Sequence, residues 1–464
     1  RMHYRFNFGL NFKFNSHLNA DLKYQREIGS LKSRQDYADD SYYVRSMVNN
    51  AAQVNGNVIT YNVPLGSQLS QVRGDHNSYT LRTQLNYDNT IADTHLVTAL
   101  AGAEIRAVKN TQTTNYYMGY DDNTLQYKTI DAIKLKNING TQSLSGRYAW
   151  DETKYNTLDE DENRYISFYS VASYVYDNRY TLTGSVRVDQ SNLFGTDPKY
   201  RYRPLWSIGS GWRMANEAFM SDVVWINALT LRLTYGIGGN VPRGAGPYLT
   251  VRDAGLNPFL KEYASRIQNP PNPTLRWEKT TTTNFGVDFS VLNNRLFGSL
   301  DLYFKKTTDL LDLRNSDPTI GWSSTYFNYG SMDNKGVELA LNSSNIKTAD
   351  FSWDSRLNLS LNKNELLNLK GTPDLVFDYI RDQVRAVGYP MGSIFSYRFA
   401  GLNPEDGWPM VYNADGEKVR NVTSTGDLVY SGTTIPTTSA SLVNTLSYKD
   451  FSVLINLVYY GGHV

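Results

Sequence analysis

The chain has 464 residues, a net charge of +1 and no cysteine, and its mean hydropathy is −0.48. The balanced charge gives no basic footprint for nucleic acid, and the missing thiols exclude disulfide scaffolds and thiolate metal sites. No run of the sequence is apolar for long enough to form a transmembrane helix, although 35 Tyr, 18 Phe and 8 Trp make the chain rich in aromatic residues.

Apolar and polar residues alternate strictly at the start of the chain. The apolar positions are Tyr4, Phe6, Phe8, Leu10, Phe12 and Phe14, and the positions between them are polar or glycine. This period of two predicts a β-strand long enough to cross a membrane. If the odd-numbered face met lipid instead, Arg5 and Lys13 would lie in hydrocarbon, and each would destabilise the barrel by about 2–4 kcal/mol near the bilayer midplane. We therefore expect the even-numbered face to meet lipid and the odd-numbered face to meet a polar lumen.

The alternation breaks at Asn15-Ser16-His17 and resumes at Leu18, which predicts a tight turn between two antiparallel strands. Further strands are expected at 79–87, 96–106, 164–176, 179–189, 202–214, 229–235, 280–292, 295–306, 335–344, 351–363, 437–448 and 451–460. The total is about fourteen to sixteen strands, depending on whether 395–402 and 408–412 form a further hairpin. Short turns alternate with long polar segments, as in outer-membrane barrels. The pattern predicts an all-β fold, a transmembrane antiparallel up-and-down β-barrel.

The sequence predicts neither an enzyme nor a metal or cofactor site. Its five histidines are scattered without the spacing that zinc sites use, and no local motif places a nucleophile beside a base. The acidic run from Asp159 to Glu162 offers the oxygen ligands that Ca²⁺ prefers, although such a run is more often simply solvated.

Six segments from residue 185 onward carry a recognisable pattern. They are SVRVDQSNLFG (185–195), RYRPLWSIGSGWRMANEAFM (201–220), LTLRLTYGIGGN (229–240), NPTLRWEKTTTTNFGVDFSVLNNRLFGSLDLYFKKTTDLL (272–311), NYGSMDNKGVELAL (328–341) and VGYPMGSIFSYRFAGLNPEDG (387–407). In order and spacing they resemble the SusC/RagA family of TonB-dependent outer-membrane transporters. The first 160 residues resemble this family only in their barrel patterning. Gly286, Gly298 and Gly336 within these motifs are expected where the strands need close packing or a bend.

The resemblance implies a barrel of about 22 strands in the outer membrane of a Gram-negative, Bacteroidetes-like cell. Residues 1–464 would form the barrel portion, with an N-terminal plug domain and the last strands lying outside this chain. The implied function is import of oligosaccharides or oligopeptides, with a SusD-like surface lipoprotein as a lid. TonB would supply energy through the plug region. The sequence does not choose between a glycan and a peptide ligand.

Three other classes share parts of the pattern. A passive porin has the same strands without a plug, and a surface adhesin can be built on a barrel. A soluble all-β binding protein would need its apolar strand faces packed together, and the aromatic outward face of the first strand disfavours it.

Aromatic residues in the long loops are the candidate substrate contacts, because a ligand must pass the loops over a barrel mouth. These candidates are Tyr116, Tyr117, Tyr120, Trp322, Tyr326 and Trp408. Loop packing or an interfacial girdle is the more frequent role for any one of them. Trp408 is the weakest candidate, since the expected hairpin places it near a periplasmic turn.

Overall fold

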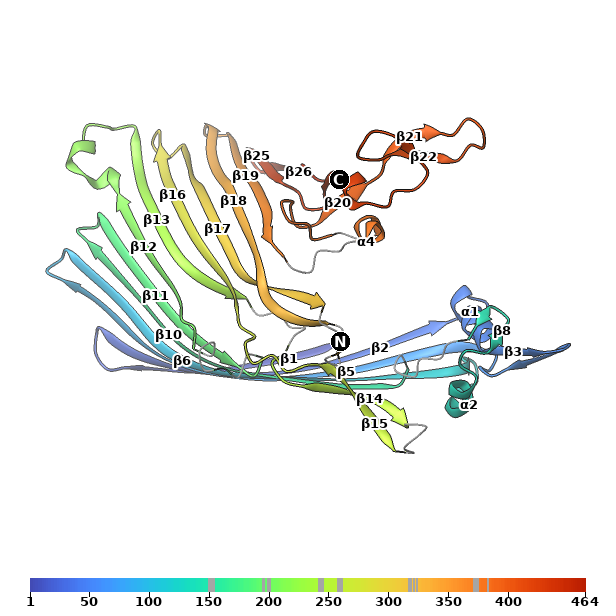
Figure 1. Ribbon diagram of the computed structural model, residues 1–464. Helices are drawn as coiled ribbons and strands as arrows, with labels where there is room; N and C mark the ends of the chain where they lie inside the picture. Colours follow the sequence, from blue (N-terminus) through green and yellow to red (C-terminus); the bar gives the residue numbers. More distant parts are fainter. Residues whose placement is uncertain are drawn as a thin grey trace. The chain divides into compact units, whose positions relative to one another are not determined.

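The computed structural model describes residues 1–148, 155–193, 197, 202–240, 246–256, 262–315, 319, 322, 324–369, 375–381 and 384–464. Contacts divide the chain into two compact units. The first contains Arg1–Phe12, Ala20–Gln84 and Ala103–Ile166, and the second contains Lys13–Asn19, Leu85–Gly102 and Ser167–Val464. Long strands dominate both units (Figure 1).

The first unit is built on five neighbouring strands. They are β1 (Met2–Lys13), β2 (Leu18–Tyr37), β5 (Ser67–Ile91), β6 (His95–Asp121) and β10 (Thr157–Tyr176), hydrogen-bonded in that order, and parts of them belong to the second unit. All five were expected from the sequence. However, β2, β5 and β6 extend many residues into segments that were expected to be loops, because a strand outside the bilayer needs no apolar face.

Smaller elements fill the rest of the first unit. They are α1 (Tyr42–Ala51), β3 (Ala52–Asn55), β4 (Val58–Tyr61), β7 (Gln126–Lys128), α2 (Ala132–Asn137), β8 (Gln142–Ser143) and β9 (Gly146–Arg147). Ser41 caps α1 by accepting a hydrogen bond from the Val44 N–H, and Asp131 caps α2 through the Lys134 N–H. Val44, Val48 and Leu135 form the centre of a small buried core. The polar segment between β2 and β5 therefore contains folded structure and is not an irregular loop throughout.

Nine further strands of the second unit pair antiparallel, each with the next in the following order. They are β11 (Tyr180–Ser191), β12 (Leu205–Arg213), β13 (Ile226–Asn240), β16 (Glu278–Val291), β17 (Leu296–Asn315), β18 (Ser324–Lys347), β19 (Phe351–Asn368), β25 (Thr438–Tyr448) and β26 (Phe451–Gly461). The predicted strands and their up-and-down order are confirmed. The connection from β12 to β13 contains the short helices η2 (Met214–Asn216) and η3 (Ala218–Met220), and β14 (Thr250–Leu256) pairs with β15 (Tyr263–Asn269) before β16.

The predicted tight turns have the backbone that their residues favour. Asp177 and Asn178 both have φ near 50°, and Asn293 and Asn294 have φ of 57° and 61°. Asp and Asn enter this left-handed region more readily than other residues with a side chain, so these dipeptides suit two-residue hairpins.

The prediction that 395–402 and 408–412 add a hairpin to the barrel is wrong. Its arms are β20 (Ser393–Ser396) with β21 (Arg398–Leu402), and β22 (Pro409–Tyr412). β21 and β22 do pair, but with β23 (Lys418–Val419) they form a separate three-stranded sheet, while β20 pairs with β24 (Val429–Thr433). The four residues of β22 reach only about 13 Å, which is too short to cross a bilayer. The helix α4 (Val376–Arg381) precedes these small sheets in the sequence, and η5 (Thr425–Asp427) lies between β23 and β24.

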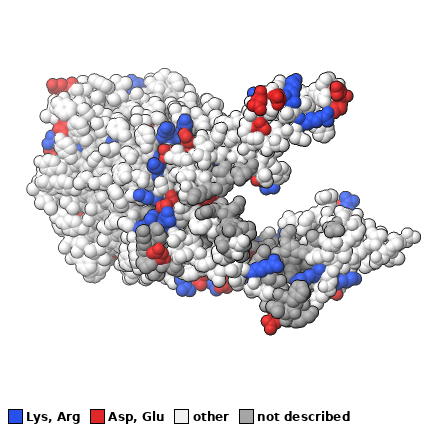
Figure 2. Space-filling model, viewed as in Figure 1, with Lys and Arg blue, Asp and Glu red and all other residues white. Residues whose placement is uncertain are grey.

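The strand surfaces are unusually apolar for a protein in water. On the even-numbered face of β1, Tyr4, Phe6 and Phe8 are each more than half exposed, as are Leu454 and Leu457 on β26. On the odd-numbered face, Arg5 and Asn11 contact Glu27 and Asp21 of β2. Figure 2 shows a wide uncharged surface over the long strands of the second unit. Exposed aromatic faces of this kind fit strands that meet lipid.

Among the described residues, no helix is both long and apolar enough to cross a bilayer.

Candidate ligand-binding site

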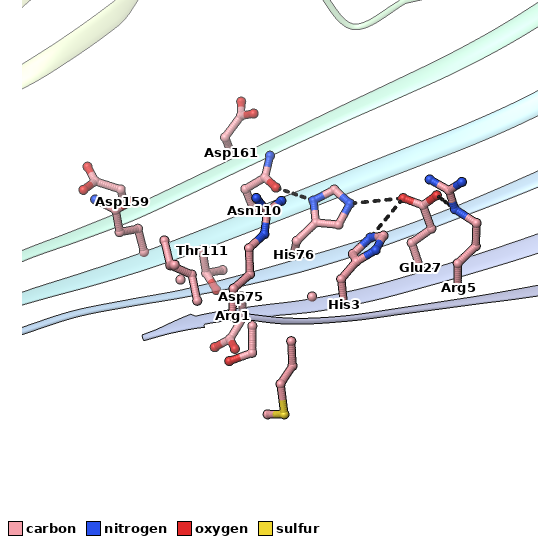
Figure 3. Close-up of a pocket in the computed structure, with 16 residues that line it drawn as sticks. Arg1, His3, Arg5, Glu27, Asp75, His76, Asn110, Thr111, Asp159 and Asp161 are labelled. Atoms are coloured by element: carbon pink, nitrogen blue, oxygen red, sulfur yellow. Dashed lines mark hydrogen bonds and ion pairs between the residues drawn. The ribbon is translucent and has the colours of Figure 1, made fainter. Parts of the chain in front are cut away.

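A cavity of about 810 Å³ lies within the first unit, lined by residues of β1, β2, β5, β6 and β10 (Figure 3). Its size falls in the range typical of small-molecule sites. The side chains at positions 3 and 5 of β1 lie on the odd-numbered face, which is the face predicted to meet a lumen. The polar face of β1 therefore contributes His3 and Arg5 to the cavity, and Met2 of the other face also lines it.

Glu27 of β2 is the centre of the cavity's charged network. Its Oε1 accepts a charge-assisted hydrogen bond from Arg5 Nε at 2.6 Å. Its Oε2 lies 3.7 Å from the Nε2 atoms of both His3 and His76. The Glu27 side chain is 12% exposed, so two strands, β1 and β5, contribute three basic groups to one largely covered carboxylate (Figure 3).

A glycine makes room for the two imidazoles. Gly29 lies two residues after Glu27 on the same face of β2, and a Cβ there would be 3.3 Å from His76 Cβ and 3.4 Å from His3 Cδ2. The two rings are 6.4 Å apart between centroids. Any larger residue at position 29 would press on both histidines.

Asn110 of β6 fixes the proton on His76. His76 Nδ1 lies 2.7 Å from Asn110 Oδ1, and an amide oxygen can only accept, so Nδ1 carries the hydrogen. In the neutral imidazole, Nε2 then presents its lone pair toward the Glu27 carboxylate.

Two carboxylates lie at the other end of the cavity. Asp159 and Asp161 of β10 share one face of their strand, away from Arg5 in Figure 3. Asp159 accepts a hydrogen bond from Thr157 Oγ1 at 3.2 Å, and Asp161 accepts one from Asn163 Nδ2 at 2.7 Å. Within the described part of the chain, neither aspartate forms an ion pair.

The acidic run at 159–162 is split between two faces. Glu160 pairs with Lys109 at 2.7 Å and Glu162 with Arg164 at 2.8 Å, whereas the two aspartates line the cavity. The four carboxylates therefore do not converge, and across the described residues no group of three or more acidic or histidine side chains is arranged to hold a metal ion.

Three of the predicted aromatic contacts lie on strand β6 and not in a loop. The ring of Tyr116 packs edge-on against Tyr155, and the ring of Tyr117 packs against Tyr127. Tyr120 is buried, and its hydroxyl accepts a hydrogen bond from Arg34 and donates one to Asp122. These contacts show how the three tyrosines pack within the protein. Their role in ligand binding stays a prediction.

The other three predicted contacts lie in the second unit. Trp322 is half-buried just before β18, and Tyr326 is half-buried within β18. Trp408 is 55% exposed in the turn between β21 and β22, which belongs to the small separate sheet. The expected position of Trp408 near a periplasmic turn of the barrel does not hold, since its hairpin is outside the sequence of long strands.

The residues around Glu27 were not among the predicted contacts. The sequence signal that existed was the polar face of the first strand, which carries His3 and Arg5. Their partners are 22 to 107 positions further along the chain, at Glu27, His76 and Asn110, and only the strand register brings them together.

Sequentially paired antiparallel strands, with exposed apolar side chains on one face and a polar cavity on the other, define the class of transmembrane β-barrel proteins. The family model described as "TonB dependent receptor-like, beta-barrel" matches residues 2–461. The chain belongs to this family, whose members are outer-membrane receptors and transporters.

Known relatives agree with this assignment. TonB-dependent receptor P26 of Formosa agariphila is 31% identical over 398 residues, covering 79% of this chain and 37% of that protein. TonB-dependent receptor SusC of Bacteroides thetaiotaomicron is 31% identical over 290 residues, covering 59% of this chain and 27% of SusC. The resemblance to SusC and RagA is confirmed. The chain spans less than two fifths of the length of these relatives.

The fold is also found in a solved transporter. The structure of the RagAB peptide importer in its open-open state aligns with a TM-score of 0.80 at 21% identity, covering 99% of this chain and 47% of that one. At this identity the likeness establishes the fold, and the expected all-β barrel class is confirmed.

Proposed function

We propose that this chain forms the barrel wall of a TonB-dependent importer that carries oligosaccharides or oligopeptides across the outer membrane. The match of the family model to nearly the whole chain is the observation that carries the proposal. SusC among the relatives and a peptide importer among the similar structures support uptake of a polymer-derived nutrient.

In this proposal the two faces of the strands have different roles. The exposed apolar side chains, such as Phe6 and Phe8, contact lipid, and the polar face forms the wall of the transport path. The cavity around Glu27 and the aromatic residues Tyr116, Tyr117, Tyr120, Trp322, Tyr326 and Trp408 are the proposed places of ligand contact. Stacking on aromatic rings suits sugars and peptide side chains alike.

The proposal also requires partners. A SusD-like surface lipoprotein would close over the barrel as a lid, and TonB would act through a plug region in the full-length protein. The cell would be a Gram-negative bacterium of the Bacteroidetes type, as the organisms of the relatives are. No nucleic acid and no catalytic step enter this function.

A passive porin and a barrel-based adhesin are the alternatives. Both share the strand pattern, but neither needs a lid protein that leaves the membrane together with the barrel. The experiment that separates them is purification of the intact complex from detergent-solubilised outer membranes, followed by mass spectrometry of proteins and bound ligand. Recovery of a SusD-like lipoprotein with glycan or peptide supports the importer, whereas a barrel that always purifies alone contradicts it.

A further inference from the structure

We propose that the cavity around Glu27 binds a cationic group of an oligopeptide, an ammonium or a guanidinium. The inference rests on the proposed import function, and it selects peptides over glycans as the ligand of this site. It follows from the charge, the partners and the composition of the cavity lining.

The lining has an excess of negative charge when the histidines are neutral. Its carboxylates are Glu27, Asp75, Asp159 and Asp161, and its guanidiniums are Arg1 and Arg5, which leaves a net charge of −2. A cavity with this excess attracts cations and repels carboxylates.

The negative charge is concentrated where a ligand can reach it. Arg5 already neutralises Glu27 at 2.6 Å, and Asp75 lies 3.5 Å from Arg73. Asp159 and Asp161, by contrast, accept hydrogen bonds from the Thr157 hydroxyl and the Asn163 amide, form no ion pair within the described residues, and both line the cavity. A ligand cation would supply the countercharge that these two aspartates lack in the described residues.

The composition of the lining disfavours sugar as the occupant. None of the 16 described residues that line the cavity is Tyr, Trp or Phe, so no aromatic platform is available for a sugar ring. The uncharged lining includes Asn110, Thr111 and Gln112 of β6, whose side chains can hydrogen-bond to the amides of a peptide.

The binding test uses the full-length importer with its lipoprotein partner in detergent, titrated calorimetrically with trilysine and triglutamate that are capped at both ends. At pH 7.5 trilysine should bind at least about tenfold more tightly than triglutamate, the difference expected for a favourable charge contact. The variant Asp159→Asn/Asp161→Asn should lose most of this preference. Equal affinity for the two peptides in the unmodified protein overturns the inference.

The matched control changes the same number of charges on the same strand. Glu160→Gln/Glu162→Gln removes two carboxylates from the other face of β10 and should keep the preference for trilysine. If the control loses it as fully as the aspartate variant does, the effect is one of general charge and the site is wrong. If the aspartate double variant does not purify with its partner, Asp161→Asn alone gives the same test with a smaller expected loss.

The outcomes of the binding test are separate from the proposed function, because a gene deletion that abolishes nutrient uptake upholds import even where Asp159→Asn/Asp161→Asn binds trilysine normally.

Discussion

Gly298 of β17 shows how closely the backbones of neighbouring strands approach each other. It pairs with Leu341 of β18, and a Cβ at this position would overlap the carbonyl oxygen of Ala340. Relief would require movement of the backbone, because the obstructing atom is not the end of a flexible side chain. The close packing expected at this motif glycine is confirmed.

We predict that Gly298→Ala lowers the free energy of unfolding by about 1–3 kcal/mol, the usual cost of overpacking. Gly184→Ala on β11 is the matched control, because nothing lies within 4 Å of its added Cβ. Thermal unfolding of the detergent-solubilised protein measures both. Equal losses in the two variants would show that the carbonyl contact is unimportant.

Glu217 joins the connection after β12 to the strands before it. Its carboxylate accepts hydrogen bonds from the Tyr180 hydroxyl at 2.5 Å, Trp212 Nε1 at 2.9 Å and Arg179 Nη1 at 3.0 Å. The hydrogen bond from Tyr180, then those from Trp212 and Arg179, hold the pKa of Glu217 below its ordinary value of 4.5. A carboxyl whose pKa is lowered by folding stabilises the fold above its unfolded pKa and loses this contribution as the pH falls.

We therefore predict that the melting temperature falls between pH 5 and pH 3, and that Glu217→Gln makes this fall shallower. The glutamine keeps the shape of the side chain but cannot take up a proton in this range. Differential scanning calorimetry across the pH series measures the slope for each protein. Parallel slopes would contradict a stabilising role for the Glu217 carboxylate.

At the level of elements, β1 carries the clearest assignment of faces. Phe8 on the even-numbered face is 60% exposed, whereas neighbouring residues on the odd-numbered face contact β2. We predict that Phe8→Arg impairs folding into lipid vesicles at a cost of about 2–4 kcal/mol, while Asn7→Arg is tolerated on the polar face. Gel-shift assays of vesicle-folded protein compare the two. Greater damage from Asn7→Arg would reverse the assigned faces.

Elements with a lipid-type alternation could be predicted from the sequence, and others could not. β1, β16 and β26 were found because every second residue is apolar, and the turn at Asp177-Asn178 because of its residue types. The polar ends of β5 and β6 carry no such pattern. β5 was therefore expected to begin later than it does, and β6 to end earlier. The hairpin at 395–412 was wrongly assigned to the barrel, because its alternation of apolar and polar residues resembles that of a barrel strand. In the structure, β22 pairs with β21 and β23 in a separate sheet.

The candidate site was less accessible than the fold for a physical reason. His3, Glu27, His76 and Asn110 meet only because four strands of different lengths share one register. A shift of one residue would send any of these side chains to the other face. The long connection between β2 and β5 hides that register in the sequence, whereas aromatic residues such as Tyr116 attracted notice through their type alone.

For the whole molecule, the family match and the exposed apolar strand faces point in the same direction. Large aromatic side chains on β1 and β26 are exposed, and the charged residues of the cavity lie on the polar side of β1. This division is what a barrel wall needs between lipid and a wet interior. Function belongs to the full-length protein with its partners, because this chain corresponds to less than half of the similar transporters.

The most direct test of the import function measures uptake of labelled oligopeptides and oligosaccharides by cells with and without this gene, before and after the proton-motive force is collapsed. We expect uptake of at least one ligand class to be lost on deletion, restored by the gene, and abolished when the proton-motive force is removed. Gene-dependent uptake that continues without the proton-motive force would identify a passive pore, and unchanged uptake in the deletion strain would contradict import altogether.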